Sequence, residues 1–185
     1  QIITEMVGSI GENMQFRRSA GVEASNGYII SYIHNAIAPD LGKIGVLLAL
    51  ETDASADVVD GLGKQIAMHI AATNPQSISI DDLDKSIIDQ ERTIYTEQAK
   101  DSGKPDNIIE KMVDGRVNKF YSEVVLMEQI FVIDNENKVS NVLYNFSKEN
   151  NCDISIKQFV RFSLGEGIEK RNEDFVAEVA AVKES

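Results

Sequence analysis

The apolar stretch at residues 44–50, Ile-Gly-Val-Leu-Leu-Ala-Leu, decides the fold of this chain. A nearly continuous apolar run of this length is typical of a central strand that is covered on both faces. Residues 28–34 predict a second strand, and Ser25-Asn26-Gly27 supplies a turn ahead of it. Apolar and polar residues alternate over 14–22, which predicts a further, half-buried strand. Three sequential strands with short links indicate an antiparallel meander.

Helical spacing begins after this sheet. Residues 55–73 predict a helix that ends at Asn74-Pro75, because the residue before proline avoids the helical region. Two further helices, one starting at the acidic run Asp81–Asp84 and one ending at Val124, meet at Ser102-Gly103-Lys104-Pro105. So short a turn requires antiparallel arms of about 20 residues, each roughly 30 Å long. Such arms leave the body, and their apolar stripe then needs a partner.

The remaining pattern completes an α+β chain. Residues 1–9 fit the end of a helix, and a helix is expected over 138–149. Alternation over 154–164 predicts another strand, and 173–183 predicts a terminal helix with acidic residues in its first turn. We therefore expect an α+β fold: an antiparallel three- to four-stranded sheet packed by helices, a protruding antiparallel helical hairpin of coiled-coil type, and a C-terminal helix. The expected divisions are a core subdomain split into 1–80 and 126–167, a hairpin insertion at 81–125, and a C-terminal module at 168–185.

Composition restricts the partners. The chain has 185 residues, with 18 Lys and Arg against 30 Asp and Glu, for a net charge of −12. Nucleic acid and anionic membranes are excluded as direct partners, because phosphate contacts need clustered basic residues. Cys152 is the sole cysteine, so no internal disulfide forms. The N-terminus has no initiator Met and no basic signal region, so a cytoplasmic fragment of a longer protein is expected.

The glycine-rich stretches of the chain do not match the familiar phosphate-binding and dinucleotide-binding motifs. Gly61-Leu62-Gly63-Lys64 is followed by Gln65 rather than Ser or Thr, and it lies inside a predicted helix. Gly165-Glu166-Gly167 has Lys170 where a dinucleotide fingerprint needs its third glycine. The sequence therefore predicts no catalytic residues, no metal site and no cofactor, and the chain is not expected to be an enzyme.

Two single residues leave alternatives. His69 borders an apolar helical stripe and is either a hydrogen-bonded structural histidine or a ligand; the lack of ligand spacing favours the structural role. Cys152 is either a buried small hydrophobe or a nucleophile, and the absence of a neighbouring base motif favours burial.

Apolar residues also fall where solvent is expected. Val132 and Ile133 lie in a loop-like segment, and Phe175 and Val179 form part of a stripe on the terminal helix. His34 stands at a strand tip on the face of neighbouring aromatic residues. These side chains either pack onto the body or form a surface for a partner.

Several motifs resemble those of translation elongation factor Ts, in order and over essentially the whole chain. They are Ile10-Gly11-Glu12-Asn13, Arg17-Arg18, Lys43-Ile44-Gly45-Val46-Leu47, Gln65-Ile66-Ala67-Met68-His69-Ile70-Ala71-Ala72, Ser102-Gly103-Lys104-Pro105, Ile109-Glu110-Lys111-Met112-Val113-Asp114-Gly115-Arg116, Phe162 with Gly165-Glu166-Gly167-Ile168-Glu169-Lys170, and Asp174-Phe175-Val176-Ala177-Glu178-Val179-Ala180-Ala181. The resemblance implies a nucleotide exchange factor that binds elongation factor Tu, in its GDP-bound and nucleotide-free states, and speeds GDP release. It also implies that this chain is the second core half of the family, with its hairpin and C-terminal module.

The chain departs from the family in two respects. It lacks the N-terminal ubiquitin-associated-like domain and the Thr-Asp-Phe-Val segment, whose Phe wedges into the GTPase. The loop over 35–42 is also longer than the tight turn of many members.

The resemblance assigns partner contacts position by position. His34 matches a histidine that approaches the nucleotide-binding domain, and Phe175 and Val179 match a helix that docks there. Apolar positions that touch the partner's third domain correspond to Ile10, Val132 and Ile133. The hairpin is a dimerisation element in some members and a free arm in others. The alternative function is therefore a structural module that dimerises through the hairpin and has little exchange activity of its own.

Overall fold

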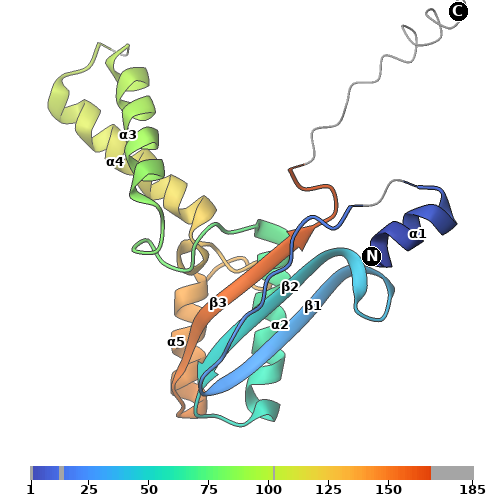
Figure 1. Cartoon of the computed structure of the whole chain (residues 1–185). Helices are drawn as coiled ribbons and strands as arrows, with labels where there is room; N and C mark the ends of the chain where they lie inside the picture. Colours follow the sequence, from blue (N-terminus) through green and yellow to red (C-terminus); the bar gives the residue numbers. More distant parts are fainter. Residues whose placement is uncertain (1, 13–14, 102, 168–185) are drawn as a thin grey trace, which may run out of the picture.

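The computed structural model describes residues 2–12, 15–101 and 103–167. Its elements are α1 (Ile2–Ile10), β1 (Gly27–Ala38), β2 (Leu41–Thr52), α2 (Ala56–Thr73), α3 (Lys85–Lys100), α4 (Asp106–Val124), the short 3-10 helix η1 (Leu126–Glu128), α5 (Val139–Asn150) and β3 (Ile154–Ser163). The α+β class is confirmed (Figure 1). The predicted helix over 173–183 lies outside the described residues.

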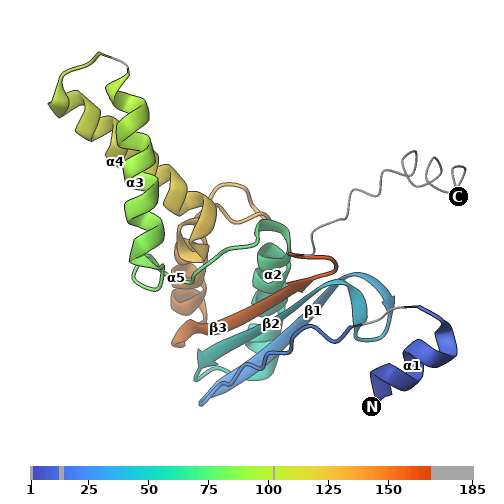
Figure 2. The same ribbon diagram turned by 45° about the horizontal axis from the view of Figure 1, so that its top comes forward.

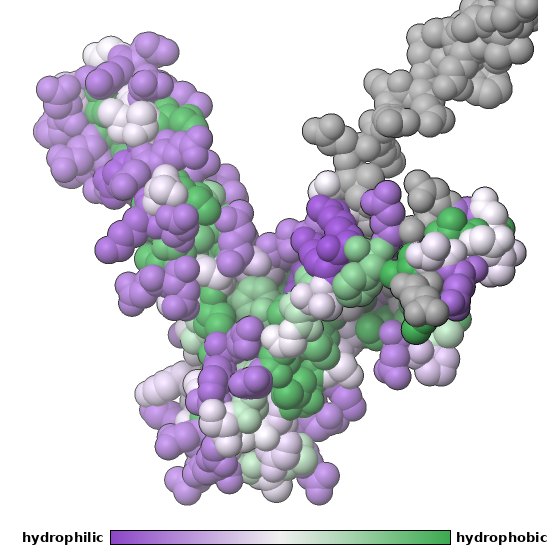
Figure 3. Space-filling view, viewed as in Figure 1, coloured by the Kyte–Doolittle hydropathy of each residue, from purple (hydrophilic) through white to green (hydrophobic). Residues whose placement is uncertain are grey.

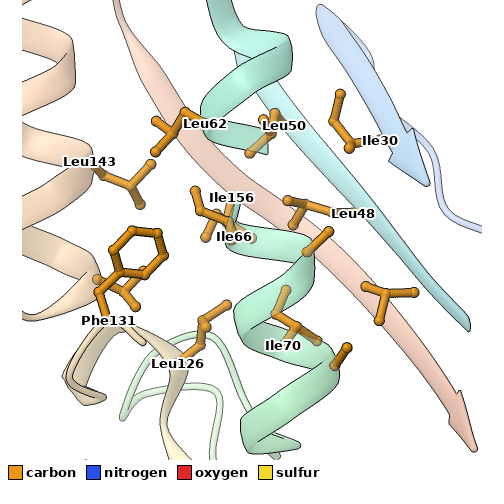
Figure 4. Packing of buried hydrophobic residues seen from close by; sticks show 14 residues of the cluster. Ile30, Leu48, Leu50, Leu62, Ile66, Ile70, Leu126, Phe131, Leu143 and Ile156 are labelled. Carbon is orange, nitrogen blue, oxygen red and sulfur yellow. The ribbon is translucent and has the colours of Figure 1, made fainter. Parts of the chain in front are cut away.

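The apolar stretch at 44–50 forms the middle of the sheet, as predicted. The strand order is β1-β2-β3, and β2 pairs antiparallel with both neighbours. Leu48, Ala49 and Leu50 are fully buried. Helix α2 crosses one face of the sheet with α5 beside it, and Ile66 from α2 meets Leu48 and Ile156 in the core (Figures 1 and 4).

Helix α2 has clear sequence causes for its end and for its close packing. Asn74 adopts a left-handed conformation at φ 50° and ends the helix, and its N–H donates to the carbonyl of Ile70. Gly63 lies inside the helix, where a Cβ atom would come within 2.7 Å of Cγ1 of Ile30. The glycine therefore allows α2 to approach the sheet, which gives the Gly61–Lys64 motif a packing role.

The prediction of a strand over 14–22 is wrong. Residues 15–24 carry no strand ladder; they form a crossing segment that passes over the sheet on the face away from α2 (Figures 1 and 2). The Arg18 guanidinium lies 4.5 Å above the Phe162 ring, and Val22 is buried. The alternation in the sequence does not mark a buried face here, because Val22 is buried whereas Phe16 is 69% exposed. The third strand is instead β3, from much later in the chain.

The predicted helical pair is present. Helices α3 and α4 lie side by side and project from the body (Figures 1 and 2). They bury a small cluster of their own, formed by Ala99, Ile109, Val113 and Val117. Asp84 caps α3, accepting a hydrogen bond from the Ser86 N–H, as expected of the acidic run. The two arms thus supply much of the partner that their apolar stripe needs.

Candidate partner-binding surface

His34 lies near the end of β1, on the strand face that it shares with Ile30 and Tyr32. It is exposed on β1, where it pairs in register with Ile44, and its Nδ1 lies 3.1 Å from the Tyr32 hydroxyl oxygen, at hydrogen-bond distance. Beyond it, the β1–β2 tip (residues 35–42) turns through Asn35 and Asp40, both left-handed with φ of 50° and 59°. His34 is therefore free to meet another molecule.

The β1–β2 tip and α1 lie at the same end of the sheet (Figures 1 and 2). Both carry exposed apolar side chains. Ile37 is 75% exposed and Leu41 is 58% exposed. Ile10, at the end of α1, is 54% exposed, and α1 has no fully buried residue. Figure 3 shows hydrophobic side chains reaching the surface over the sheet and α1, while the hairpin is largely hydrophilic on this face. Exposed apolar groups of this kind are characteristic of interaction surfaces.

The segment Phe131–Ile133 follows η1, and its side chains become more exposed along the segment. Phe131 is buried, Val132 is half-buried and Ile133 is 44% exposed. A tight turn behind the segment holds this arrangement: the Asn135 N–H donates to the Phe131 carbonyl at 2.8 Å, and Asp134 accepts from the Asn137 N–H at 3.1 Å. Hydrogen bonds from backbone N–H groups lower the pKa of Asp134, so its carboxylate stays ionised.

His69 lies beneath this segment and is completely buried, which confirms its structural role. Its Nε2 lies 2.9 Å from Oε1 of Gln129, and the Val132 N–H donates to its Nδ1 at 3.2 Å. Burial lowers the pKa of His69, against the raising effect of the hydrogen bond to Gln129. The sequence reasoning missed Gln129, which is only 3% exposed. A lone amide within the apolar run 126–133 was the available signal.

The burial of His69 predicts a pH-dependent stability. The unfolded chain takes up a proton near pH 6.5, the ordinary pKa of His, while the folded chain holds His69 neutral to lower pH. The unfolded state then binds more protons, so the free energy of unfolding falls as pH drops below about 6.5. Urea titrations at pH 7.5 and 5.5 measure this effect, and in His69→Gln the loss between the two pH values is expected to shrink. An equal loss in both proteins would assign the effect to other groups.

The other candidate positions fall in separate places. Cys152 is buried, as predicted. Phe175 and Val179 lie outside the described residues. Ile10 and His34 lie on α1 and β1, while Val132 and Ile133 lie on the segment anchored to α2.

Within 2–12, 15–101 and 103–167, no group of three or more His, Cys, Asp or Glu side chains is arranged to hold a metal ion. Among the helices in the described part of the chain, none is long and apolar enough to cross a membrane.

The α+β body with a projecting helical hairpin defines a structural class, and the exposed apolar side chains at the free end of its sheet are of a kind that often marks an interaction surface. Comparison with known proteins narrows this class. The family model described as elongation factor TS matches residues 1–166, and the chain belongs to the elongation factor Ts family.

Curated relatives agree with this assignment. Elongation factor Ts of Rhodospirillum rubrum is 55% identical over 179 residues, which cover 97% of this chain and 58% of that protein. The protein of Paramagnetospirillum magneticum is 54% identical over 179 residues, 97% of this chain and 57% of its own length. That of Erythrobacter litoralis is 53% identical with coverages of 97% and 58%. The chain thus spans somewhat more than half the length of these relatives.

Proposed function

We propose that this chain binds elongation factor Tu and promotes the release of GDP from it during translation elongation. The observation that carries the proposal is membership of the elongation factor Ts family over residues 1–166. Exchange requires only that the factor and GDP weaken each other's binding to the GTPase, a reciprocal coupling between two sites. The factor needs no catalytic groups or cofactor of its own, since the hydrolytic chemistry belongs to the partner. The chain would act in the cytoplasm, on the GDP-bound and nucleotide-free forms.

The proposed contacts are the six positions Ile10, His34, Val132, Ile133, Phe175 and Val179. The exposure of Ile10, His34 and Ile133 supports their availability to a partner. Val132 is half-buried and would contribute through the part of its side chain that reaches solvent. The assignment of Phe175 and Val179 as contacts rests on the family resemblance alone.

Replacing Ile133 by Asp tests the proposal. We expect the affinity for GDP-bound elongation factor Tu to fall by about 1–3 kcal/mol, because an unpaired carboxylate would be buried in the interface. The free chain should stay folded, since Ile133 is 44% exposed. Calorimetric titration measures the affinity, and Val58→Asp on the first turn of α2, at 39% exposure, is the matched control. Equal affinities for both variants and the unaltered chain would remove Ile133 from the interface.

The second candidate function is a structural module that dimerises through the hairpin. Ile94 and Ile108, which are 38% and 42% exposed on α3 and α4, favour it, because they leave apolar surface on the outside of the arms. The internal cluster of the hairpin favours a free arm instead. Sedimentation at micromolar concentration distinguishes a dimerising hairpin from a free arm. A monomer under these conditions would contradict the dimerisation function.

A further inference from the structure

A buried polar network lies beneath the segment Phe131–Ile133. Its members are His69 on α2, which is fully buried, and Gln129 after η1, which is 3% exposed. The Thr73 hydroxyl also lies 2.9 Å from Oε1 of Gln129. Burying such groups is costly unless each makes its hydrogen bonds, so the network fixes where these side chains sit.

The hydrogen bonds also fix the protonation of the His69 ring. Nε2 of Gln129 donates to the carbonyl of Glu123 at 2.8 Å, which leaves Oε1 as the acceptor that faces His69. The imidazole must therefore carry its proton on Nε2. Its Nδ1 then has a free lone pair, and that lone pair accepts the N–H of Val132 at 3.2 Å.

The Val132 N–H is thus held by a side chain from another element. The neighbouring backbone groups of the segment bond to nearby backbone: the Phe131 N–H donates to the Asn137 carbonyl at 2.8 Å, and the Phe131 carbonyl accepts from Asn135. The Phe131 ring packs against the His69 ring, with 5.6 Å between their centroids. One imidazole therefore joins α2 to the backbone of the exposed segment.

We propose that His69 is a positioning residue that fixes the backbone at Val132 and so sets the orientation in which Val132 and Ile133 meet a protein partner. The inference rests on the proposed function, since it concerns the same surface. His69 is fully buried and acts only through the segment above it. The segment is then pre-organised, which reduces the ordering cost of binding.

Two variants of His69 separate its two hydrogen bonds. His69→Asn puts an amide near the Nδ1 position and can retain an acceptor for Val132, whereas His69→Gln puts the amide near Nε2 and loses it. In His69→Gln we expect the Val132 amide to exchange with solvent about tenfold faster than in the unaltered chain, and the affinity for elongation factor Tu to fall about tenfold. His69→Asn should retain more of the amide protection at Val132 and more of the affinity for elongation factor Tu. Thr73→Val is the control, because it perturbs the network while keeping the His69–Val132 bond.

The outcomes distinguish this inference from the proposed function. Unchanged affinity in a folded His69→Gln variant, beside tight binding by the unaltered chain, overturns the positioning role and leaves the proposed function intact. A chain that does not bind the GTPase at all overturns both. If His69→Gln fails to fold, amide exchange in the unaltered chain decides: the inference predicts that Val132 is protected well above Ile133, and equal, fast exchange at both overturns it.

Discussion

Replacing Val113 by Asp is expected to unfold the α3–α4 hairpin and leave the body folded. Val113 is 3% exposed in a cluster that only the two arms form. Burying an unpaired carboxylate there costs several kcal/mol. This cost exceeds the free energy that stabilises an isolated pair of helices of this length. The far-UV circular dichroism signal should fall, and hydrogen exchange should accelerate throughout α3 and α4 and stay slow in α2.

The matched control is Asn118→Asp, which adds the same charge at an exposed position of α4. It should leave the hairpin intact. If Val113→Asp kept full helical signal and slow exchange in both arms, the small cluster could not be what holds the arms together.

Replacing Ile66 by Ala is expected to lower the free energy of unfolding of the body by about 2–5 kcal/mol. Ile66 is fully buried between the sheet and α5, so truncation removes apolar contacts and leaves a cavity (Figure 4). Urea unfolding followed by circular dichroism measures the loss. Met68→Ala on the same helix, at 39% exposure, should cost much less. Similar losses for both variants would place Ile66 outside the core.

The sequence predicted the parts of the fold that depend on local patterns. The apolar run at 44–50 is the central strand, and Asn74-Pro75 and the turn at Gly103 separate the helices as expected. The pattern could not show that residues 15–24 cross the sheet instead of pairing in it, because alternation of apolar and polar residues carries no information on hydrogen bonding. The predicted order of strands in the sheet was wrong for a related reason. Strand β3 pairs with β2 across about a hundred residues of intervening chain, and local periodicity carries no information on such pairings.

The candidate surface was predictable only in part. Exposure of Ile10, His34 and Ile133 agrees with their assignment as partner contacts, which itself stays a prediction. The sequence indicated that His69 is structural, but its bond to the Val132 N–H joins residues 63 positions apart in sequence. Such a contact depends on tertiary packing and has no local signature. Gln129 was hidden in the same way, since an amide in an apolar run is equally compatible with a turn at the surface.

The most direct test of the proposed function is the rate of fluorescent GDP release from elongation factor Tu as this chain is titrated in. We expect the rate to rise and saturate, because an exchange factor forms a complex with the GTPase and GDP from which GDP dissociates faster, and this complex is fully populated at saturating concentration. His34→Ala should lower the saturating rate while the chain stays folded. A rate that stays flat at every concentration, with no competition by the chain against full-length elongation factor Ts, would contradict the proposed function.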